Sequence, residues 1–146
     1  MISEAAQAVR EIDIRAAWPS DQAFVASTMR EQLCRRHGDI IGMQFKRADI
    51  LIDRILDSER TRVLVACDGK RIIGWLAYVE IPRVRALLFA YVRKDDREQG
   101  VAARLAAQAW PRATGKWVYP GGIQGYSAAS LLRKFDVAEV DLEELL

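Results

Sequence analysis

Cysteine, histidine and proline are scarce in this chain of 146 residues. It contains two cysteines, one histidine and four prolines. Cys34 and Cys67 form no spaced motif, so the sequence predicts neither a disulfide framework nor a metal site built on cysteine. A reduced, cytoplasmic compartment is therefore the default expectation, and no metal cofactor is expected.

Long apolar runs and an excess of one charge are also missing. The longest apolar runs, such as 72–79, have the length of a strand and cannot cross a bilayer. Glu4, Arg10 and Glu11 stand where a signal peptide would have its apolar core. The net charge is +2, from 22 basic and 20 acidic residues. That balance argues against non-specific nucleic-acid binding, and no membrane association is expected.

The pattern of apolar residues predicts one α/β domain that covers residues 1–146. The length is sufficient for a single substantial core. Strands are predicted at 11–15, 62–67, 71–81, 84–92, 116–119 and 138–145. Helices are predicted up to about Gln32, around 48–55, from about Gly100 to Pro111, and at 127–134. The strands at 62–67 and 71–81 are apolar on both faces, so helices should cover both sides of the sheet.

The most informative segment leads from the strand at 84–92 into the alanine-rich helix. It reads Arg97-Glu-Gln-Gly100-Val-Ala102, an R-x-x-G-x-A pattern. A strand that enters a helix through such a turn directs several free backbone N–H groups to one point, where the helix dipole adds positive charge. Gly100 allows close backbone approach and Ala102 adds little bulk. The pattern therefore predicts a cradle for a pyrophosphate.

Together these segments resemble the GNAT superfamily of N-acetyltransferases, as a short and divergent member. In that family an R/Q-x-x-G-x-G/A turn holds the pyrophosphate of acetyl-CoA. The segment Asp68-Gly-Lys-Arg-Ile-Ile-Gly74 is similar to the hairpin between its second and third strands. The resemblance extends from Ile12 to about Val140. It implies an α/β fold of the α+β type, with a mixed, mostly antiparallel sheet of about six strands and about four helices.

The resemblance also implies an activity and a cofactor site. Acetyl-CoA would bind between the fourth and fifth strands, and its acetyl group would pass directly to a primary amine of a small molecule or protein. The fourth strand would offer main-chain groups to the pantetheine arm, with the Val92 amide near the thioester. The implied cofactor-binding residues are Tyr91, Val92, Arg97, Glu98, Gln99, Gly100, Val101, Ala102 and Arg104.

The catalytic groups depart from the family pattern. Many members protonate the leaving thiolate with a tyrosine on a late helix, but Leu132 stands at that position here. Tyr119 and Tyr126 are candidate substitutes, and Glu80 is a candidate base that acts through water. The fourth strand carries no acid, so the family's glutamate route is absent. Because the thiol of coenzyme A leaves readily, losing the acid slows the reaction without forbidding it.

Two alternatives stay open. A degenerate GNAT-fold protein would act as a binding or structural subunit with little or no turnover, and small members of this kind also occur in phage genomes. The family's usual last strand is missing, so the sheet edge is open or is completed by a partner, as in a homodimer. A nucleic-acid-binding module is the second alternative. It is supported by a set of basic residues: Arg30, Arg35, Arg36, Lys46 and Arg47. In an acetyltransferase, the same residues would favour an acidic acceptor of the acetyl group.

Overall fold

One six-stranded sheet forms the centre of the molecule. A computed structural model describes residues 11–35, 42–81, 84–109, 116–120 and 137–140. The strands follow chain order across the sheet: β1 (Asp13–Ala16), β2 (Thr61–Asp68), β3 (Arg71–Ile81), β4 (Val84–Val92), β5 (Lys116–Pro120) and β6 (Val137–Val140). Neighbours from β1 to β4 pair antiparallel, whereas β4 with β5 and β5 with β6 pair parallel. The predicted α/β class and the mixed, mostly antiparallel sheet are confirmed.

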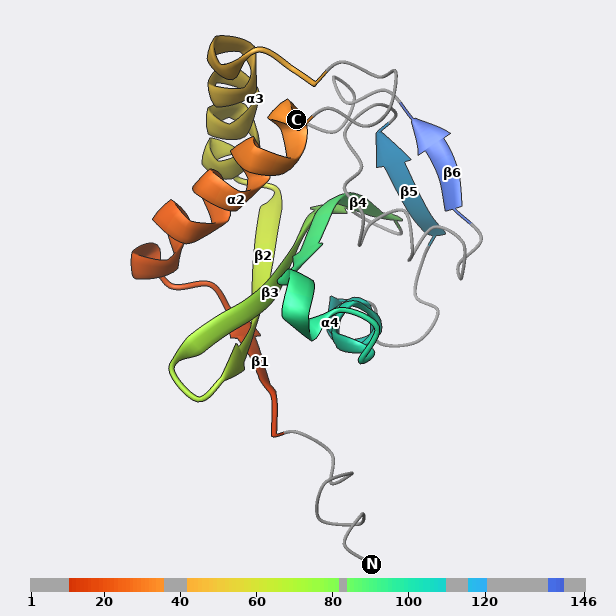
Figure 1. The fold of residues 1–146 in the computed structure, drawn as a ribbon. Helices are drawn as coiled ribbons and strands as arrows, with labels where there is room; N and C mark the ends of the chain where they lie inside the picture. Colours follow the sequence, from red (N-terminus) through yellow and green to blue (C-terminus); the bar gives the residue numbers. More distant parts are fainter. Residues whose placement is uncertain (1–10, 36–41, 82–83, 110–115, 121–136, 141–146) are drawn as a thin grey trace, which may run out of the picture.

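Helices cover both faces of the sheet, as the apolar strands require (Figure 1). In the described residues these are α2 (Gln22–Cys34), α3 (Phe45–Asp57) and α4 (Val101–Ala109), with short 3₁₀ turns η1 (Pro19–Asp21) and η2 (Lys94–Asp96). Buried residues of α2 and α3 share one core with the sheet, and those of α4 share a second core on the opposite face. The predicted late helix at 127–134 lies outside the described residues.

Trp75 of β3 organises the core beneath α2. Its side chain is fully buried, and its ring stacks on Phe89 of β4 with 5.6 Å between centroids. The Trp75 indole N–H donates to the hydroxyl oxygen of Thr28 at 2.8 Å, and that hydroxyl donates to the Phe24 carbonyl at 2.8 Å. The polar edge of the indole is thereby satisfied inside the core. Both apolar packing and a hydrogen bond therefore fix α2 to the sheet.

Gly74 of β3 lets α4 approach the opposite face closely. A Cβ atom at Gly74 would lie 2.8 Å from the Tyr91 carbonyl oxygen and 3.4 Å from methyl carbons of Val101 and Val92. Real Cβ atoms are not found that close to a backbone oxygen, so any side chain here would push the strands or the helix apart. Gly74 therefore lets β4 pair closely with β3 beside the first residue of α4.

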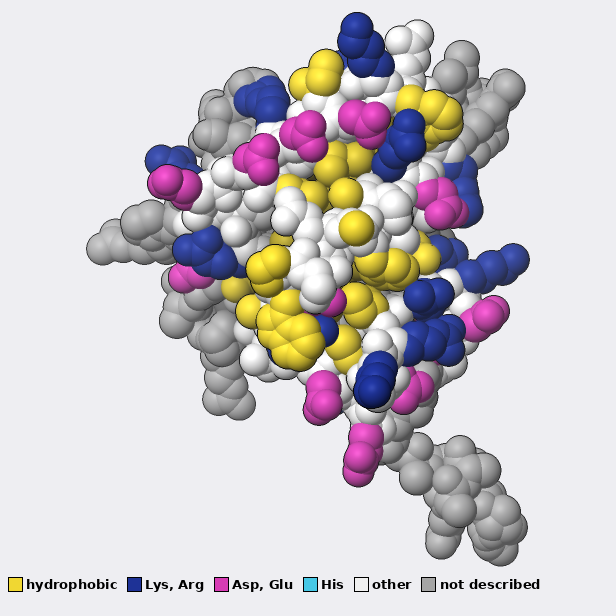
Figure 2. All heavy atoms as spheres, turned by 90° about the vertical axis from the view of Figure 1, so that its left-hand side faces the viewer, with side chains coloured by type: hydrophobic (Ala, Val, Ile, Leu, Met, Phe, Trp, Pro, Cys, Tyr) yellow, Lys and Arg dark blue, Asp and Glu magenta, His cyan; other side chains and the backbone are white. Residues whose placement is uncertain are grey.

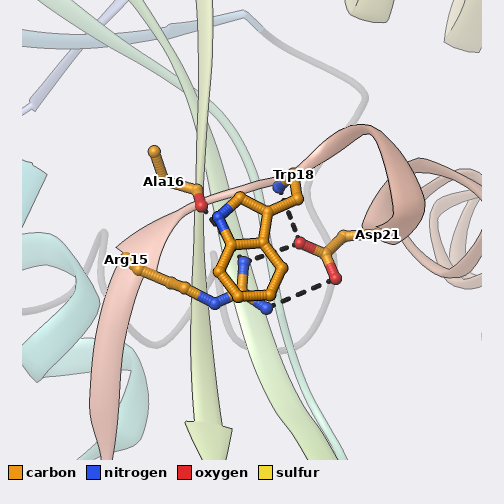
Figure 3. Close-up of polar contacts among 4 residues, drawn as sticks. All are labelled: Arg15, Ala16, Trp18 and Asp21. Carbon is orange, nitrogen blue, oxygen red and sulfur yellow. Dashed lines mark hydrogen bonds and ion pairs between the residues drawn. The ribbon is translucent and has the colours of Figure 1, made fainter.

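Asp21 fixes the passage from β1 into α2 (Figure 3). Its carboxylate accepts hydrogen bonds from the Trp18 backbone N–H and from Arg15 Nη1, each at 2.7 Å. The Arg15 guanidinium also lies 3.5 Å from the centre of the Trp18 ring. The Arg15 hydrogen bond holds the pKa of Asp21 below its ordinary value, and the Trp18 N–H adds to this, while burial opposes both. The buried carboxylate is therefore kept charged and paired.

Candidate functional site

β4 has an open edge inside the sheet. It pairs with β5 at three positions, 84–86 against 116–118, although β4 continues to Val92 and β5 to Pro120. Beyond Ala86, the only ladder partner of β4 among the described residues is β3. Figure 1 shows the two strands lying apart beyond this point. The divergence leaves one edge of β4 available to an extended ligand.

A β-bulge stands where the opening begins. Ala77 of β3 faces Phe89, and Tyr78 faces Leu87, which leaves Leu88 as the extra residue of β4. Leu88 and Phe89 are consecutive, yet both pack in the core beneath α2 and α3. A bulge bends its strand and increases the local twist. We infer that the bulge turns the second half of β4 away from β5.

The alternation of β4 decides which main-chain groups face the opening. The Arg93 N–H donates to the Ile73 carbonyl at 2.8 Å, so the main chain at Arg93 points toward β3. In antiparallel pairing, successive residues point their polar groups to opposite edges. The N–H and C=O groups of Val92 and Ala90 therefore point away from β3, into the opening. Val92 was predicted from the sequence and Ala90 was not, although two-residue spacing from Val92 would have identified it.

The turn after β4 has the backbone form expected of an anion cradle. Glu98 and Gly100 both have positive φ, of 64° and 81°. Glycine adopts such values readily, which accounts for Gly100. A Cβ atom at Gly100 would meet nothing within 4 Å, so the space in front of the turn is open. The conformation, and not crowding within the protein, therefore requires glycine at this position.

The first turn of α4 directs main-chain donors to the same place. α4 begins at Val101, and the Arg104 N–H donates to the Gly100 carbonyl at 3.0 Å. The N–H groups of Val101, Ala102 and Ala103 precede that bond, so the helix itself offers them no acceptor. They point out of the helix end, where the dipole favours negative charge. The arrangement can hold a phosphate group through main-chain atoms alone.

Three of the predicted cofactor-binding residues around the turn make internal contacts. Arg97 Nε donates to the Val92 carbonyl at 2.9 Å. Arg104 Nη2 donates to the Ile12 carbonyl at 3.1 Å, so its side chain extends toward the start of β1. The amide nitrogen of Gln99 donates to the Asp95 carbonyl at 3.4 Å. Their roles as cofactor ligands stay predictions. In the structure, each of these side chains is hydrogen-bonded to a main-chain carbonyl of the protein.

Tyr91, another predicted cofactor residue, packs its ring under α2. The ring lies 6.1 Å from that of Trp75 and 6.3 Å from that of Phe24, measured between centroids. It is half-buried. By the same alternation, the main chain of Tyr91 faces β3, so neither its ring nor its backbone points into the opening beside β4.

The candidate catalytic residues are spread along the sheet. Glu80 of β3 faces Arg85, whereas Gly74 of β3 faces Val92. At about 3.3 Å per residue, Glu80 and the Val92 level are on the order of 20 Å apart along the strands. Tyr119 follows directly after the last β5 residue that pairs with β4, so its backbone stands where the strands diverge. Tyr126 lies outside the described residues, as does Leu132.

Charged side chains on the α2 and α3 face occur with both signs (Figure 2). Arg30 pairs with Asp49 at 3.2 Å, and Arg35 with Glu31 at 3.0 Å. The predicted basic surface is therefore partly neutralised where the structure describes it. Within the described ranges, no cluster of three or more His, Cys, Asp or Glu residues could hold a metal ion. No helix in the same residues has the length and apolar character of a membrane span.

Comparison with known proteins gives matches in structure only. No protein-family model matches the sequence, and no curated protein matches it significantly. A ribosomal-protein-alanine N-acetyltransferase from Brucella melitensis biovar Abortus 2308 superposes with a TM-score of 0.58 and 18% identity, over 84% of this chain and 89% of that one. AAC(6')-Iy, in complex with the bisubstrate analogue CoA-S-monomethyl-acetylneamine, gives 0.56 and 18% over 90% and 93%. The fold of this chain is therefore that of the GNAT acetyltransferases.

A third structure of this kind contains coenzyme A. PaiA N-acetyltransferase from Thermoplasma acidophilum, in complex with coenzyme A, superposes with a TM-score of 0.52 and 17% identity. The match covers 68% of this chain and 69% of that one. At such identities the likeness establishes the fold, and the chemistry has to be argued from the residues of this chain.

Proposed function

We propose that this protein binds acetyl-CoA along the open edge of β4 and transfers the acetyl group to a primary amine. The observation that carries the proposal is the continuity of that edge with the Gly100 turn and the start of α4. Main-chain groups of Ala90 and Val92 suit an extended arm that contains amides, and the N–H groups at the helix end suit a pyrophosphate. Acetyl-CoA contains these two parts in succession. Coenzyme A complexes among proteins of the same fold support the proposal.

The main chain contributes positioning and charge stabilisation in this proposal. Acetyl-CoA supplies an acetyl thioester that an amine can attack. Val92 adjoins the start of α4, so a main-chain N–H of β4 deeper in the opening would donate to the thioester carbonyl oxygen as negative charge develops there. Holding amine and thioester together provides much of the acceleration. As the C–N bond forms and the C–S bond breaks, Tyr119 or Tyr126 would protonate the thiolate, and Glu80 would accept the amine proton through water.

The acceptor is proposed to be a primary amine on a small molecule or a protein. The ion pairs of Arg30 and Arg35 reduce the positive field near α2 and α3, so a preference for anionic acceptors should be modest. β6 pairs with β5 at one edge and with no other described strand. We propose that edge as the surface through which a homodimer would form.

A binding or structural subunit with little turnover is the second candidate function. One observation favours it: leucine, which cannot donate a proton, stands at position 132. This weakens protonation of the thiolate without altering the cradle. A subunit of this kind keeps the fold with or without the cofactor site, so an acetyl-CoA titration followed by thiol release separates it from the first candidate.

A thiol-release assay with a panel of amines tests the proposal. Acetyl-CoA is supplied at millimolar concentration, and the amines include anionic, neutral and spermidine-like compounds at low and moderate salt. Release of coenzyme A that depends on the amine supports transfer. Binding of acetyl-CoA without any amine-dependent release would favour the second candidate. Failure to bind acetyl-CoA would remove the first candidate and leave only a subunit without a cofactor site.

A further inference from the structure

Arg97 makes a contact that a phosphate ligand would not require. Its Nε atom donates to the Val92 carbonyl at 2.9 Å, across the turn that joins β4 to α4. The Arg97 side chain is half-buried, although it lies in a surface turn. The bond links the last residue of the strand to the first residue of the motif.

The Val92 carbonyl is the group for which such a bond matters. It points into the opening, beside the N–H groups of the first turn of α4. A bare carbonyl oxygen there would set a partial negative charge next to a site that favours anions. A hydrogen bond from a guanidinium compensates that charge. It also leaves the Val92 N–H as the group of this residue that is presented to a ligand.

The turn is held at its other end by Arg93. Arg93 Nε donates to the Ile72 carbonyl at 2.6 Å, and its guanidinium carbon lies 5.0 Å from the centre of the Phe24 ring. Within the turn, the Asp96 N–H donates to the Arg93 carbonyl at 2.9 Å. With Arg93 bound to β3 and Arg97 bound to β4, both ends of the turn are fixed before any ligand arrives.

We propose that Arg97 is a positioning residue of the cofactor site, acting through the Val92 carbonyl and not through a phosphate. The inference rests on the proposed function, because it assigns a role within the same site. It states that a hydrogen-bond donor at the position of Nε is sufficient, and that the positive charge of the guanidinium is not needed.

Two substitutions separate the donor from the charge. Glutamine carries its amide nitrogen on Cδ, as arginine carries Nε, so Arg97→Gln keeps a donor at the same distance along the side chain and removes the charge. Arg97→Met removes both. Arg62→Gln is the control for the loss of an arginine far from the turn, since Arg62 also donates to a backbone carbonyl, from Nη1 to that of Glu59 at 2.7 Å.

The experiment measures dissociation constants for coenzyme A and for S-acetylpantetheine, which has no phosphate, and the unfolding midpoint without ligand. We expect Arg97→Gln to bind coenzyme A within about 3-fold of wild type, and Arg97→Met about 10-fold more weakly. The loss in Arg97→Met should appear with both ligands. Its unfolding midpoint should fall by about 3–5 °C, with little change for Arg97→Gln.

The opposite pattern would overturn the inference. A 10-fold loss in Arg97→Gln, a loss in Arg97→Met confined to coenzyme A, or no loss in Arg97→Met would each show that Arg97 does not act through the carbonyl. Wild-type protein that fails to bind coenzyme A would reject the proposed function instead. The unfolding midpoints would then still report whether the internal hydrogen bond exists.

Discussion

Glycine is required at two positions for two different physical reasons. Gly74 has no room for a side chain, because the Tyr91 carbonyl lies 2.8 Å from where a Cβ would be. Gly100 has open space around it but a φ of 81°. The sequence motif identified Gly100 and its turn. The crowding at Gly74 depends on how β4 pairs with β3 beside α4, which no local pattern reports.

Gly74→Ala should lower the free energy of unfolding by about 2–3 kcal/mol, because the added methyl group overlaps backbone that cannot move freely. Urea unfolding at neutral pH measures the change. Gly69→Ala is the control, since it adds the same methyl group at the β2–β3 turn, where φ is 64° and nothing lies within 4 Å. That variant should lose only about 1 kcal/mol. Equal losses would contradict the close approach of the Tyr91 carbonyl to Gly74.

Asp21→Asn should destabilise the protein by about 1–2 kcal/mol at pH 7, since it removes the charged acceptor of hydrogen bonds from the Arg15 guanidinium and the Trp18 N–H. The pKa of Asp21 is lower in the folded than in the unfolded protein. Its contribution is therefore complete above the unfolded value, about 3.9, and is lost as pH falls through the folded value.

Urea unfolding at pH 7 and pH 3 should accordingly show the difference between wild type and Asp21→Asn narrowing at the lower pH. Asp13→Asn, at an exposed position of β1, should change stability by less than about 0.5 kcal/mol at neutral pH. A difference of the same size at both pH values would show that the Asp21 charge does not matter.

At the scale of elements, the sequence predicted the bounds of the strands but not the bulge in β4. The bounds of β3 and β4 agree with the predicted 71–81 and 84–92. The bulge at Leu88 was not predicted, because 86–92 is apolar at every position and a one-residue slip leaves no break in the pattern. The opening of β4 was implied only by resemblance. The opening exists because β4 pairs with β5 at only three positions in the described residues. Where that pairing stops is set by the packing of the whole sheet and not by the local sequence.

Tyr119 tests whether the diverging strands form a catalytic centre. If the protein turns over, Tyr119→Phe or Tyr126→Phe should lower kcat by about 10- to 100-fold, as expected for loss of a general acid. KM for acetyl-CoA should change little, since the hydroxyl would act on the departing thiolate. Steady-state thiol release measures both constants. Unchanged kcat in both variants would mean that the thiolate leaves unaided or takes its proton from water.

At the scale of the whole molecule, the helices on the two faces of the sheet hold the turn between β4 and α4 in place, which lets that turn serve as the proposed binding site. α2 and α3 anchor β3 and β4 from one face, and α4 packs on the other with its N-terminus at the end of β4 (Figure 1). The fold class and the turn around Gly100 could be predicted because strand, turn and helix are contiguous in sequence, whereas the role of that turn as a cradle stays a prediction. The positions of the candidate catalytic residues Tyr119 and Glu80 could not be predicted, because the geometry of the sheet sets them.

Calorimetric titration of acetyl-CoA into wild-type protein and into Gly100→Glu tests the central claim most directly. Glutamate at this position adds bulk and negative charge where the pyrophosphate is proposed to lie, and circular dichroism checks that the variant is folded. We expect wild type to bind with a dissociation constant between about 1 μM and 1 mM, the usual range for enzyme substrates. Gly100→Glu should show no binding. Absence of binding in wild type at millimolar acetyl-CoA, or equal binding by the folded variant, would contradict the account.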